Sequence, residues 1–286
     1  MKQELVRINS IDDIEQVGIL YAPNNITNKI VIHVHGLNGN FYENKFLDTL
    51  AETYTNKNYA FLTFNNRGKD YISEFSKGDT SIIIGGSLER FKDCLLDIEG
   101  VIKWAKEKGY SEITLEGHSY GCNKVLYYYN KKKDDSINKI VLLAPCDIPS
   151  EGKKFLNKTE YEIAKEDATR LVNERKEQEL IDFSVMANGK IAAETYYYDF
   201  LPGGENDFIR YSDGENSKSP ILNSINLPVL IIFGNIDECV LTQPIEIVKK
   251  YLENNISNCK IEVINGADHS YTNKYEELCK VIEDNF

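Results

Sequence analysis

The chain has 286 residues, a length that a single large α/β domain can fill and that allows a sizeable hydrophobic core. Its 33 Lys and Arg against 45 Asp and Glu give a formal net charge of −12, which argues against nucleic acid and anionic membrane surfaces as partners. With 42% hydrophobic and 27% charged residues, the composition is that of a folded globular protein and not of a disordered chain or a bundle of membrane spans.

The first half of the chain alternates apolar segments of strand length with amphipathic segments of helix length. Residues 4–8 and 17–21 are predicted to form an antiparallel edge. Further strands are predicted at 29–35, 59–64, 112–116 and 139–144, and helices at 43–55, from an N-cap at Ser87 to 108, and through 129. This alternation implies right-handed crossovers and a mainly parallel sheet with helices on both faces.

The pattern changes between residues 151 and 220. Residues 160–183 are highly charged with one apolar helical face, and an aromatic, glycine-rich, irregular stretch follows. The α/β alternation then returns, with strands predicted at 229–233 and 260–264 and helices at 245–252 and from 273. We therefore expect one α/β core made of residues 1–150 and 221–286, interrupted by a cap or lid over residues 151–220.

Neither the N-terminus nor the cysteines indicate export, membrane anchoring or metal binding. Residues 1–16 lack the apolar stretch of a secretory signal, and no later run approaches the roughly 18 apolar residues of a membrane span. We expect a cytoplasmic protein. The six cysteines contain no C-x-x-C pair and have no histidines at zinc spacing, which predicts reduced thiols rather than disulfides or a metal site.

The sequence Gly117-His118-Ser119-Tyr120-Gly121 matches the nucleophile-elbow pattern G-x-S-x-G. It follows a predicted strand and precedes a predicted helix, which is where an elbow belongs. Small neighbouring residues allow the tight turn that exposes a serine hydroxyl. Ser119 is therefore the predicted catalytic nucleophile.

A nucleophilic serine needs a histidine base and a carboxylate that orients it, in the chain order Ser, Asp or Glu, His. Of the four histidines, His33 lies in a predicted strand, His118 inside the elbow and His35 beside a glycine in a loop. His269, in the loop between the last strand and the last helix, is therefore the predicted base.

The predicted acid is Asp237, which follows the strand at 229–233 and precedes His269 by 32 residues. Asp147, after the strand at 139–144, is the alternative. Asp268 is less suitable because it adjoins the histidine in sequence.

Acyl transfer also needs hydrogen-bond donors for the developing oxyanion. The backbone N–H of Tyr120, directly after the nucleophile, is one predicted donor, and that of Leu37, in the loop HGLNGN, is the other. His33 and His35 form an H-x-H pair, but no further ligand cluster follows, so no metal site is predicted there.

Taken together, HG-x after a strand, GHSYG, the aspartate of GNIDECV and the histidine of GADHS resemble the α/β-hydrolase superfamily over essentially the whole chain. GHSYGCNKVLYYY, APCD and LPGGENDF further resemble a branch that includes fungal siderophore esterases. The resemblance implies a serine esterase without a cofactor, acting on an ester of a hydroxamate or another polar acyl compound.

The residues leave several functions open. Ester cleavage is favoured over thioester or amide cleavage, a hydrolase-fold binding protein without catalysis is a further alternative, and the partner expected is a small acyl substrate. Tyr197 and Phe208 of the insertion are candidate substrate-binding residues, although its aromatic residues could equally form a small core of their own. The sequence does not determine the oligomeric state.

Overall fold

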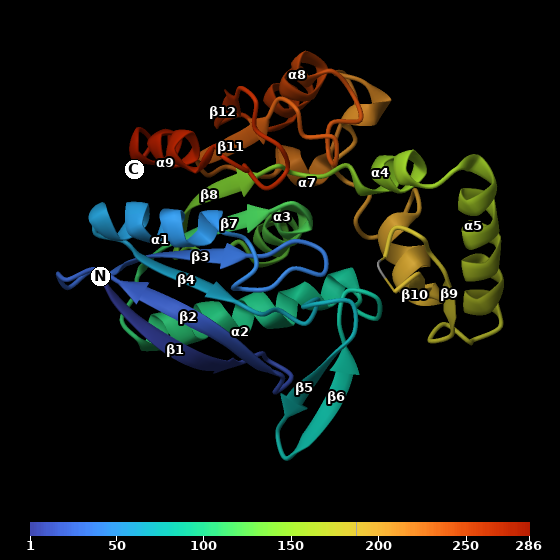
Figure 1. Ribbon diagram of the computed structural model, residues 1–286, viewed down its shortest axis with the longest axis horizontal. Coiled ribbons are helices and arrows are strands. Elements are labelled where there is room, and N and C mark those ends of the chain that lie inside the picture. Colours follow the sequence, from blue (N-terminus) through green and yellow to red (C-terminus); the bar gives the residue numbers. More distant parts are fainter. Residues whose placement is uncertain (187) are drawn as a thin grey trace.

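The centre of the computed structural model, which describes residues 1–186 and 188–286, is an eight-stranded sheet of order β1-β2-β4-β3-β7-β8-β11-β12 (Figure 1). From β4 to β12 all neighbours are parallel, whereas β2 runs antiparallel to both of its neighbours. The strands are β1 (Lys2–Asn9), β2 (Glu15–Ala22), β3 (Lys29–Val34), β4 (Ala60–Phe64), β7 (Glu112–His118), β8 (Ile137–Leu143), β11 (Val229–Gly234) and β12 (Cys259–Ile264). This topology confirms the predicted N-terminal antiparallel pair and the mainly parallel sheet.

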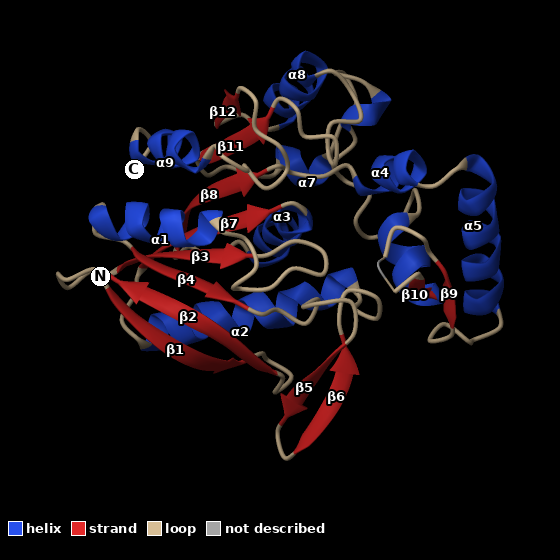
Figure 2. Cartoon of the chain, in the orientation of Figure 1, coloured by secondary structure: helices blue, strands red, loops and turns tan. Residues whose placement is uncertain are grey.

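Helices cover both faces of this sheet (Figure 2). Alternate residues of a strand point to opposite faces, and in β3 Ile30 and Ile32 belong to one apolar core while Val31 belongs to another. The first core includes side chains of α2 (Cys94–Glu107), α3 (Tyr120–Lys132) and α8 (Ile245–Asn255), and the second those of α1 (Phe46–Asn56) and α9 (Tyr275–Glu283). Burial on both faces explains why the central strands read as continuous apolar runs.

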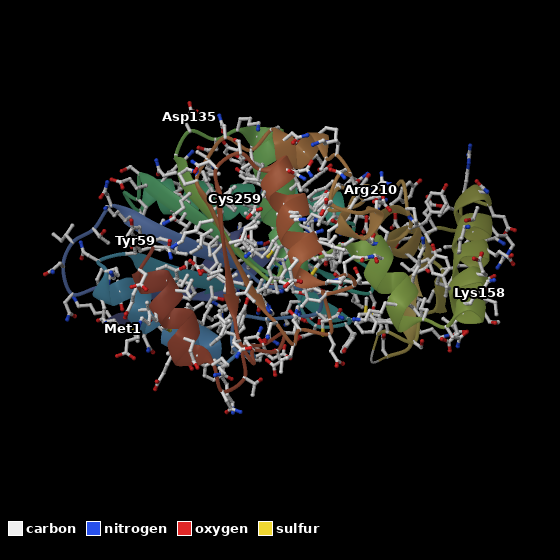
Figure 3. All side chains as sticks on the ribbon, turned by 90° about the horizontal axis from the view of Figure 1, so that it is seen from above. Met1, Tyr59, Asp135, Lys158, Arg210 and Cys259 are labelled. Carbon is white, nitrogen blue, oxygen red and sulfur yellow. The ribbon has the colours of Figure 1, made fainter. Side chains whose placement is uncertain are left out.

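Between β8 and β11 the chain leaves the sheet and lies beyond the carboxyl ends of the central strands (Figure 1). Seen from above, Lys158 at the start of α5 and Tyr59 before β4 lie at opposite ends of the molecule (Figure 3). The elements of this part are α4 (Ile148–Phe155), α5 (Lys158–Asn173), β9 (Leu180–Asp182), β10 (Lys190–Ala192), α6 (Ala193–Thr195), the π-helix η2 (Tyr196–Phe200), the 3₁₀-helix η3 (Tyr211–Asp213) and α7 (Pro220–Asn223). Residues 151–220 are called the insertion below.

Two local predictions are corrected by the structure. The helix expected to begin at Ser87 is α2, which begins only at Cys94 after a 3₁₀ turn, η1 (Phe91–Asp93). Ser87 does not cap it, because its backbone is used elsewhere: its N–H donates to the carbonyl of Tyr71, and its carbonyl accepts from Ala192 in the insertion. The helix predicted within residues 160–183 ends at Asn173, and the short strand β9 follows it.

A third difference concerns residues 73–84, for which no element is predicted from the sequence. They form a separate antiparallel hairpin of β5 (Ser73–Lys77) and β6 (Thr80–Ile84). Ile14 and Ile84 pack with Phe75 in a small third core beneath the hairpin. None of the helices in the described part of the chain combines the length and apolar composition that a membrane span needs.

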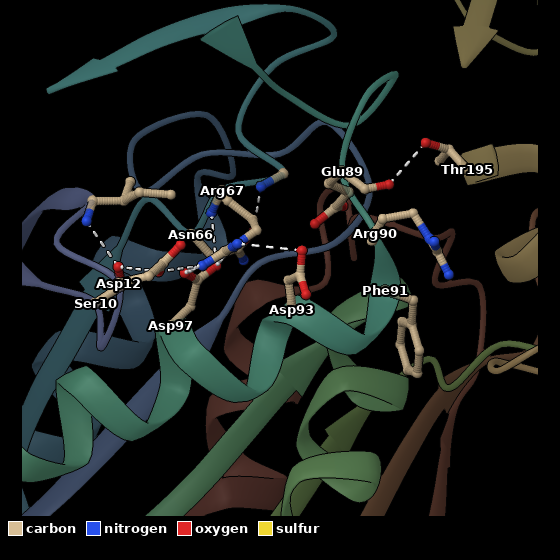
Figure 4. A network of polar contacts seen from close by, with 12 residues as sticks. Ser10, Asp12, Asn66, Arg67, Glu89, Arg90, Phe91, Asp93, Asp97 and Thr195 are labelled. Atoms are coloured by element: carbon tan, nitrogen blue, oxygen red, sulfur yellow. Dashed lines mark hydrogen bonds and ion pairs between the residues drawn. The ribbon is translucent and has the colours of Figure 1, made fainter. Parts of the chain in front are cut away.

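The segment around Glu89 joins the sheet, α3 and the insertion through buried polar contacts. Lys124 of α3 donates to both carboxylate oxygens of Glu89 at 2.9 and 2.7 Å, and both side chains are fully buried. The hydroxyl of Thr195 in the insertion donates to the Glu89 carbonyl at 2.8 Å (Figure 4). Nearby, Arg67 forms ion pairs with Asp97, Asp12 and Asp93 (Figure 4). These contacts fix the loop that follows β4 and the base of the insertion.

Candidate active site

Ser119 lies in a sharp turn between β7 and α3, at the centre of the sheet. Its backbone has φ 55° and ψ −128°, a conformation that residues with side chains rarely adopt and that is characteristic of strained functional turns. Two residues later, a Cβ atom on Gly121 would lie 2.1 Å from the carbonyl oxygen of Val34. Only glycine therefore lets α3 pack so closely against β3, which accounts for the final glycine of the motif.

Asp237 and His269 meet at the carboxyl ends of β11 and β12. His269 Nδ1 lies 2.9 Å from Asp237 Oδ2, and the carboxylate is buried while the imidazole is partly exposed. Asp237 Oδ1 accepts the backbone N–H groups of Cys239 at 3.0 Å and Val240 at 3.3 Å. These bonds fix the carboxylate, which can in turn hold the Nδ1–H tautomer of His269 and leave Nε2 free as an acceptor.

Ser119 and His269 line one cavity of about 170 Å³. Leu37 also lines it, as do Gly36, Gly39, Glu43, Asn44, His118 and Ser270. Within the described residues Ser119 Oγ makes one contact of hydrogen-bond type, with Cys146 Sγ at 3.5 Å, and none with His269. Catalytic hydrogen bonds are often long in the absence of substrate, so this rotamer is compatible with a nucleophile.

The two predicted oxyanion donors lie on either side of Ser119. Tyr120 is the first residue of α3, so its N–H has no partner within the helix. Leu37 N–H donates no hydrogen bond to any described residue. A Cβ atom on Gly36 would lie 2.9 Å from Ser119 Cβ, so glycine is needed for this loop to approach the nucleophile.

The other three histidines are buried, and their rings make hydrogen bonds that support the structure. His35 accepts Asn66 N–H at Nε2 and donates from Nδ1 to the Gly36 carbonyl at 2.8 Å, which orients the loop beside Ser119. Burial and the nearby Lys124 charge lower the pKa of His35 to about 3, so the imidazole stays neutral. His33 is bonded to Glu116 at 2.7 Å.

His118 is adjacent to the site and supports it. Its Nε2 donates to the backbone carbonyl of His269 at 2.9 Å, and the two imidazole rings lie 4.8 Å apart. Burial lowers the pKa of His118 well below its usual range, so it holds the His269 loop as a neutral donor. The position of His118 inside the elbow argues against it as the base, and its supporting role is visible only in the folded chain, which brings residue 269 against it.

The alternative acid, Asp147, is engaged elsewhere. Its side chain caps α4 by accepting Ser150 N–H, and its other oxygen accepts Ser212 N–H at 2.9 Å. The third aspartate, Asp268, accepts Ser270 and Thr272 N–H groups within its own turn. Of the three aspartates weighed, only Asp237 contacts His269.

The structure separates the two candidate substrate-binding residues from Ser119. Tyr197 lines a different cavity of about 570 Å³, between α4, α5 and η2, together with Lys153 and Tyr161. Phe208 is buried in the main core, with its ring 6.3 Å from Phe91 and 6.4 Å from Tyr127. Neither lines the cavity that contains Ser119.

Two further residues near Ser119 carried no sequence signal. Cys146, after β8, contacts the serine hydroxyl, and burial raises the pKa of its thiol well above the usual range. Glu151, on α4, has a buried Oε1 without a hydrogen-bond partner among the described residues. Burial and the charges of Asp147 and Asp237 raise the pKa of the Glu151 carboxyl well above its usual range. Cys146 follows β8 and Glu151 lies on α4, so only the folded chain brings the two residues to the catalytic groups.

The parallel sheet, the strand order and the serine turn after β7 together define an α/β-hydrolase fold, as predicted. The chain belongs to the family described as "Protein of unknown function (DUF1749)", whose model matches residues 13–284. Its sequence is similar to "Putative esterase/lipase 3" of Mycoplasma genitalium, with 24% identity over 291 residues that cover 97% of this chain and 94% of that protein.

Solved structures of similar fold cover almost the whole chain. Est1E from Butyrivibrio proteoclasticus with bound ferulic acid has a TM-score of 0.69 and 21% identity, and the match covers 98% of this chain and 97% of that one. DcsB in complex with its substrate analogue has a TM-score of 0.69 and 17% identity, covering 99% and 97%. The esterase Pf2001 from Pyrococcus furiosus has a TM-score of 0.60 and 17% identity, covering 99% and 89%.

Proposed function

We propose that this protein is a serine hydrolase that cleaves carboxylic esters through an acyl-enzyme intermediate on Ser119. The observation that carries the proposal is the 2.9 Å contact between His269 and a buried Asp237, at the rim of the cavity that also contains the strained Ser119. The similarity to a protein named as an esterase/lipase supports the same reaction.

In the proposed reaction, Ser119 Oγ turns from Cys146 toward His269 and attacks the ester carbonyl carbon. The hydroxyl proton passes to His269 Nε2, and Asp237 stabilises the resulting imidazolium. The carbonyl oxygen becomes an oxyanion that accepts the N–H groups of Leu37 and Tyr120. His269 then returns the proton to the departing alkoxide, and the same groups activate a water that releases the acid from Ser119.

The cavity at Ser119 suggests the kind of ester. It is small, and its only charged side chain outside the histidines is Glu43, so we expect short, uncharged acyl groups to be favoured over anionic ones. The resemblance to siderophore esterases suggests esters of polar or hydroxamate-bearing acids as substrates. The ferulic acid bound to Est1E suggests esters of aryl acids. The insertion is proposed to act as a cap that limits which of these reach Ser119.

Hydrolysis of neutral esters of graded acyl size by the purified protein tests this proposal. The wild type is expected to turn over short esters, and Ser119→Ala to lose about 10³-fold or more in kcat with an unchanged circular dichroism spectrum. His269→Ala should be comparably impaired. Full activity in a folded Ser119→Ala protein would overturn the proposal, and faster cleavage of the matched amide than of the ester would favour an amidase instead.

A further inference from the structure

A cysteine adjoins the proposed acid and base. Asp237, Cys239 and His269 each offer one ligand atom, a carboxylate oxygen, a thiol sulfur and an imidazole nitrogen, and these three atoms lie within 4.8 Å of one another. Cys239 is exposed, and its backbone N–H is already held by Asp237. A cation could therefore approach the three groups from solvent.

The geometry and the donor types suit a tetrahedral soft cation. Zn²⁺ binds sulfur at about 2.3 Å and nitrogen or oxygen at about 2.0–2.2 Å, which places neighbouring ligands roughly 3.3–3.8 Å apart. The Asp237–His269 separation of 2.9 Å is a hydrogen-bond distance that must widen by about 0.4 Å or more, and the Cys239 sulfur, within 4.8 Å of both ligand atoms, must move nearer to them. Sulfur and nitrogen donors favour Zn²⁺ or Cd²⁺ over Mg²⁺.

The surrounding charges favour a cation. The negative charges of Asp237 and Asp268 lie near the Cys239 thiol, and the positive charge of Lys154 opposes them. Lys154 Nζ is engaged with the carbonyl oxygens of Glu238 and Leu241. A cation that binds the Cys239 sulfur as a thiolate must displace the thiol proton to solvent. This requirement selects thiophilic cations that bind thiolate strongly.

We propose that Asp237, Cys239 and His269 form an inhibitory site for Zn²⁺ and related soft divalent cations. The cation would bind Asp237 oxygen, Cys239 sulfur and His269 Nδ1, and the single proton of the neutral imidazole would then reside on Nε2. Nε2 is the atom that must accept the Ser119 proton in the proposed reaction, on which this inference rests. A bound cation therefore removes the general base without covering Ser119.

The test compares Cys239→Ala with Cys259→Ala, a substitution at a half-buried cysteine outside the site. Without metal, both variants should hydrolyse esters at the wild-type rate, because neither side chain takes part in the reaction. Added ZnCl₂ should inhibit the wild type and Cys259→Ala reversibly, with recovery in EDTA, and MgCl₂ should not. Cys239→Ala should need at least about 10- to 100-fold more Zn²⁺ for half inhibition, because it removes a direct ligand and even the loss of an outer-shell partner has an effect of that size.

Equilibrium dialysis with ZnCl₂ adds a readout that needs no catalysis. The wild type and Cys259→Ala should each bind one more equivalent of Zn²⁺ with high affinity than Cys239→Ala does. Equal Zn²⁺ binding by the wild type and Cys239→Ala would overturn this inference even if the protein is an esterase. If the protein lacked esterase activity but Cys239 were needed for Zn²⁺ binding, the metal site would stand and the proposed function would fail.

Discussion

The Asp237 carboxylate is buried and accepts three hydrogen bonds, from His269 and from the backbone of Cys239 and Val240. Asp237→Asn would keep the shape of the side chain but favour the wrong tautomer of His269. We expect kcat to fall by about 10⁴-fold with little change in stability. Ester turnover and thermal unfolding measured on the same sample check this prediction.

Asp147→Asn is the matched control for Asp237→Asn. Asn is as good an N-cap as Asp, so α4 stays capped, but the new amide nitrogen cannot accept Ser212 N–H. The loss of this hydrogen bond should lower stability by about 0.5–1.5 kcal/mol and leave kcat within about tenfold of wild type. The assignment of the acid would be reversed if Asp147→Asn were the more damaging of the two for turnover.

At the level of single residues, the sequence predicts those functional residues that belong to a motif or follow a fixed chain order. Ser119 follows from the elbow motif, and His269 and Asp237 from chain order and from the few histidines available. The neighbours Cys146, Glu151 and Cys239 could not be predicted as a group. Cys146 lies in the loop after β8, Glu151 on α4 and Cys239 in the loop after β11, and no local sequence pattern encodes their approach to one another.

Among the elements, α3 depends on the buried ion pair of Lys124 and Glu89. Lys124→Met should lower the free energy of unfolding by about 3–5 kcal/mol, because it leaves the Glu89 carboxylate buried without its cation. The double variant Lys124→Met with Glu89→Gln should recover much of that loss, since it leaves no unpaired charge buried. Urea unfolding of the three proteins measures this, and a double variant no more stable than Lys124→Met would contradict it.

The insertion contains aromatic residues of two kinds. Phe208 packs in the core against Phe91 and Tyr127, so Phe208→Ala should destabilise the protein by about 3–5 kcal/mol. Tyr197 lines the cavity between α4, α5 and η2, so Tyr197→Ala should leave stability within about 1 kcal/mol.

A specificity role of the insertion has its own kinetic signature. Tyr197 lines a cavity separate from that of Ser119, so Tyr197→Ala can act only on esters long enough to extend into it. We expect KM to change by about tenfold for such bulky esters and to stay unchanged for short ones. Parallel loss of short-ester and bulky-ester activity in Tyr197→Ala, with the fold intact, would show instead that the insertion supports the catalytic groups.

Strong periodicity made most core elements predictable, and tertiary contacts decided the exceptions. The strands at the centre of the sheet are apolar on both faces and were recognisable as short continuous runs. The start of α2 differs from the predicted one because the backbone of Ser87 makes hydrogen bonds with Tyr71 and Ala192, which are distant in sequence. The β5–β6 hairpin was missed because its strands expose most of their residues and lack a strong apolar alternation.

At the scale of the whole molecule, the sheet brings together loops that are far apart in the chain. Ser119 follows β7, Asp237 follows β11 and His269 follows β12, and the order β7-β8-β11-β12 places these strand ends along one edge. The alternation of strands and helices along the chain predicts this arrangement, because the carboxyl ends of parallel strands lie at the same edge of the sheet. The cavity at Ser119 is lined by the loops after β3, β7 and β12, and their exact conformation has no periodic sequence signal.

Covalent labelling tests the central claim, that Ser119 is an activated nucleophile, most directly. The wild type is treated with a fluorophosphonate, which reacts with activated serines, and the labelled peptide is identified by mass spectrometry. We predict one label, on Ser119, formed at a rate that falls at least about 10²-fold in His269→Ala. A folded wild type that hydrolyses esters while Ser119 stays unlabelled, or that is labelled on another serine, would contradict the account.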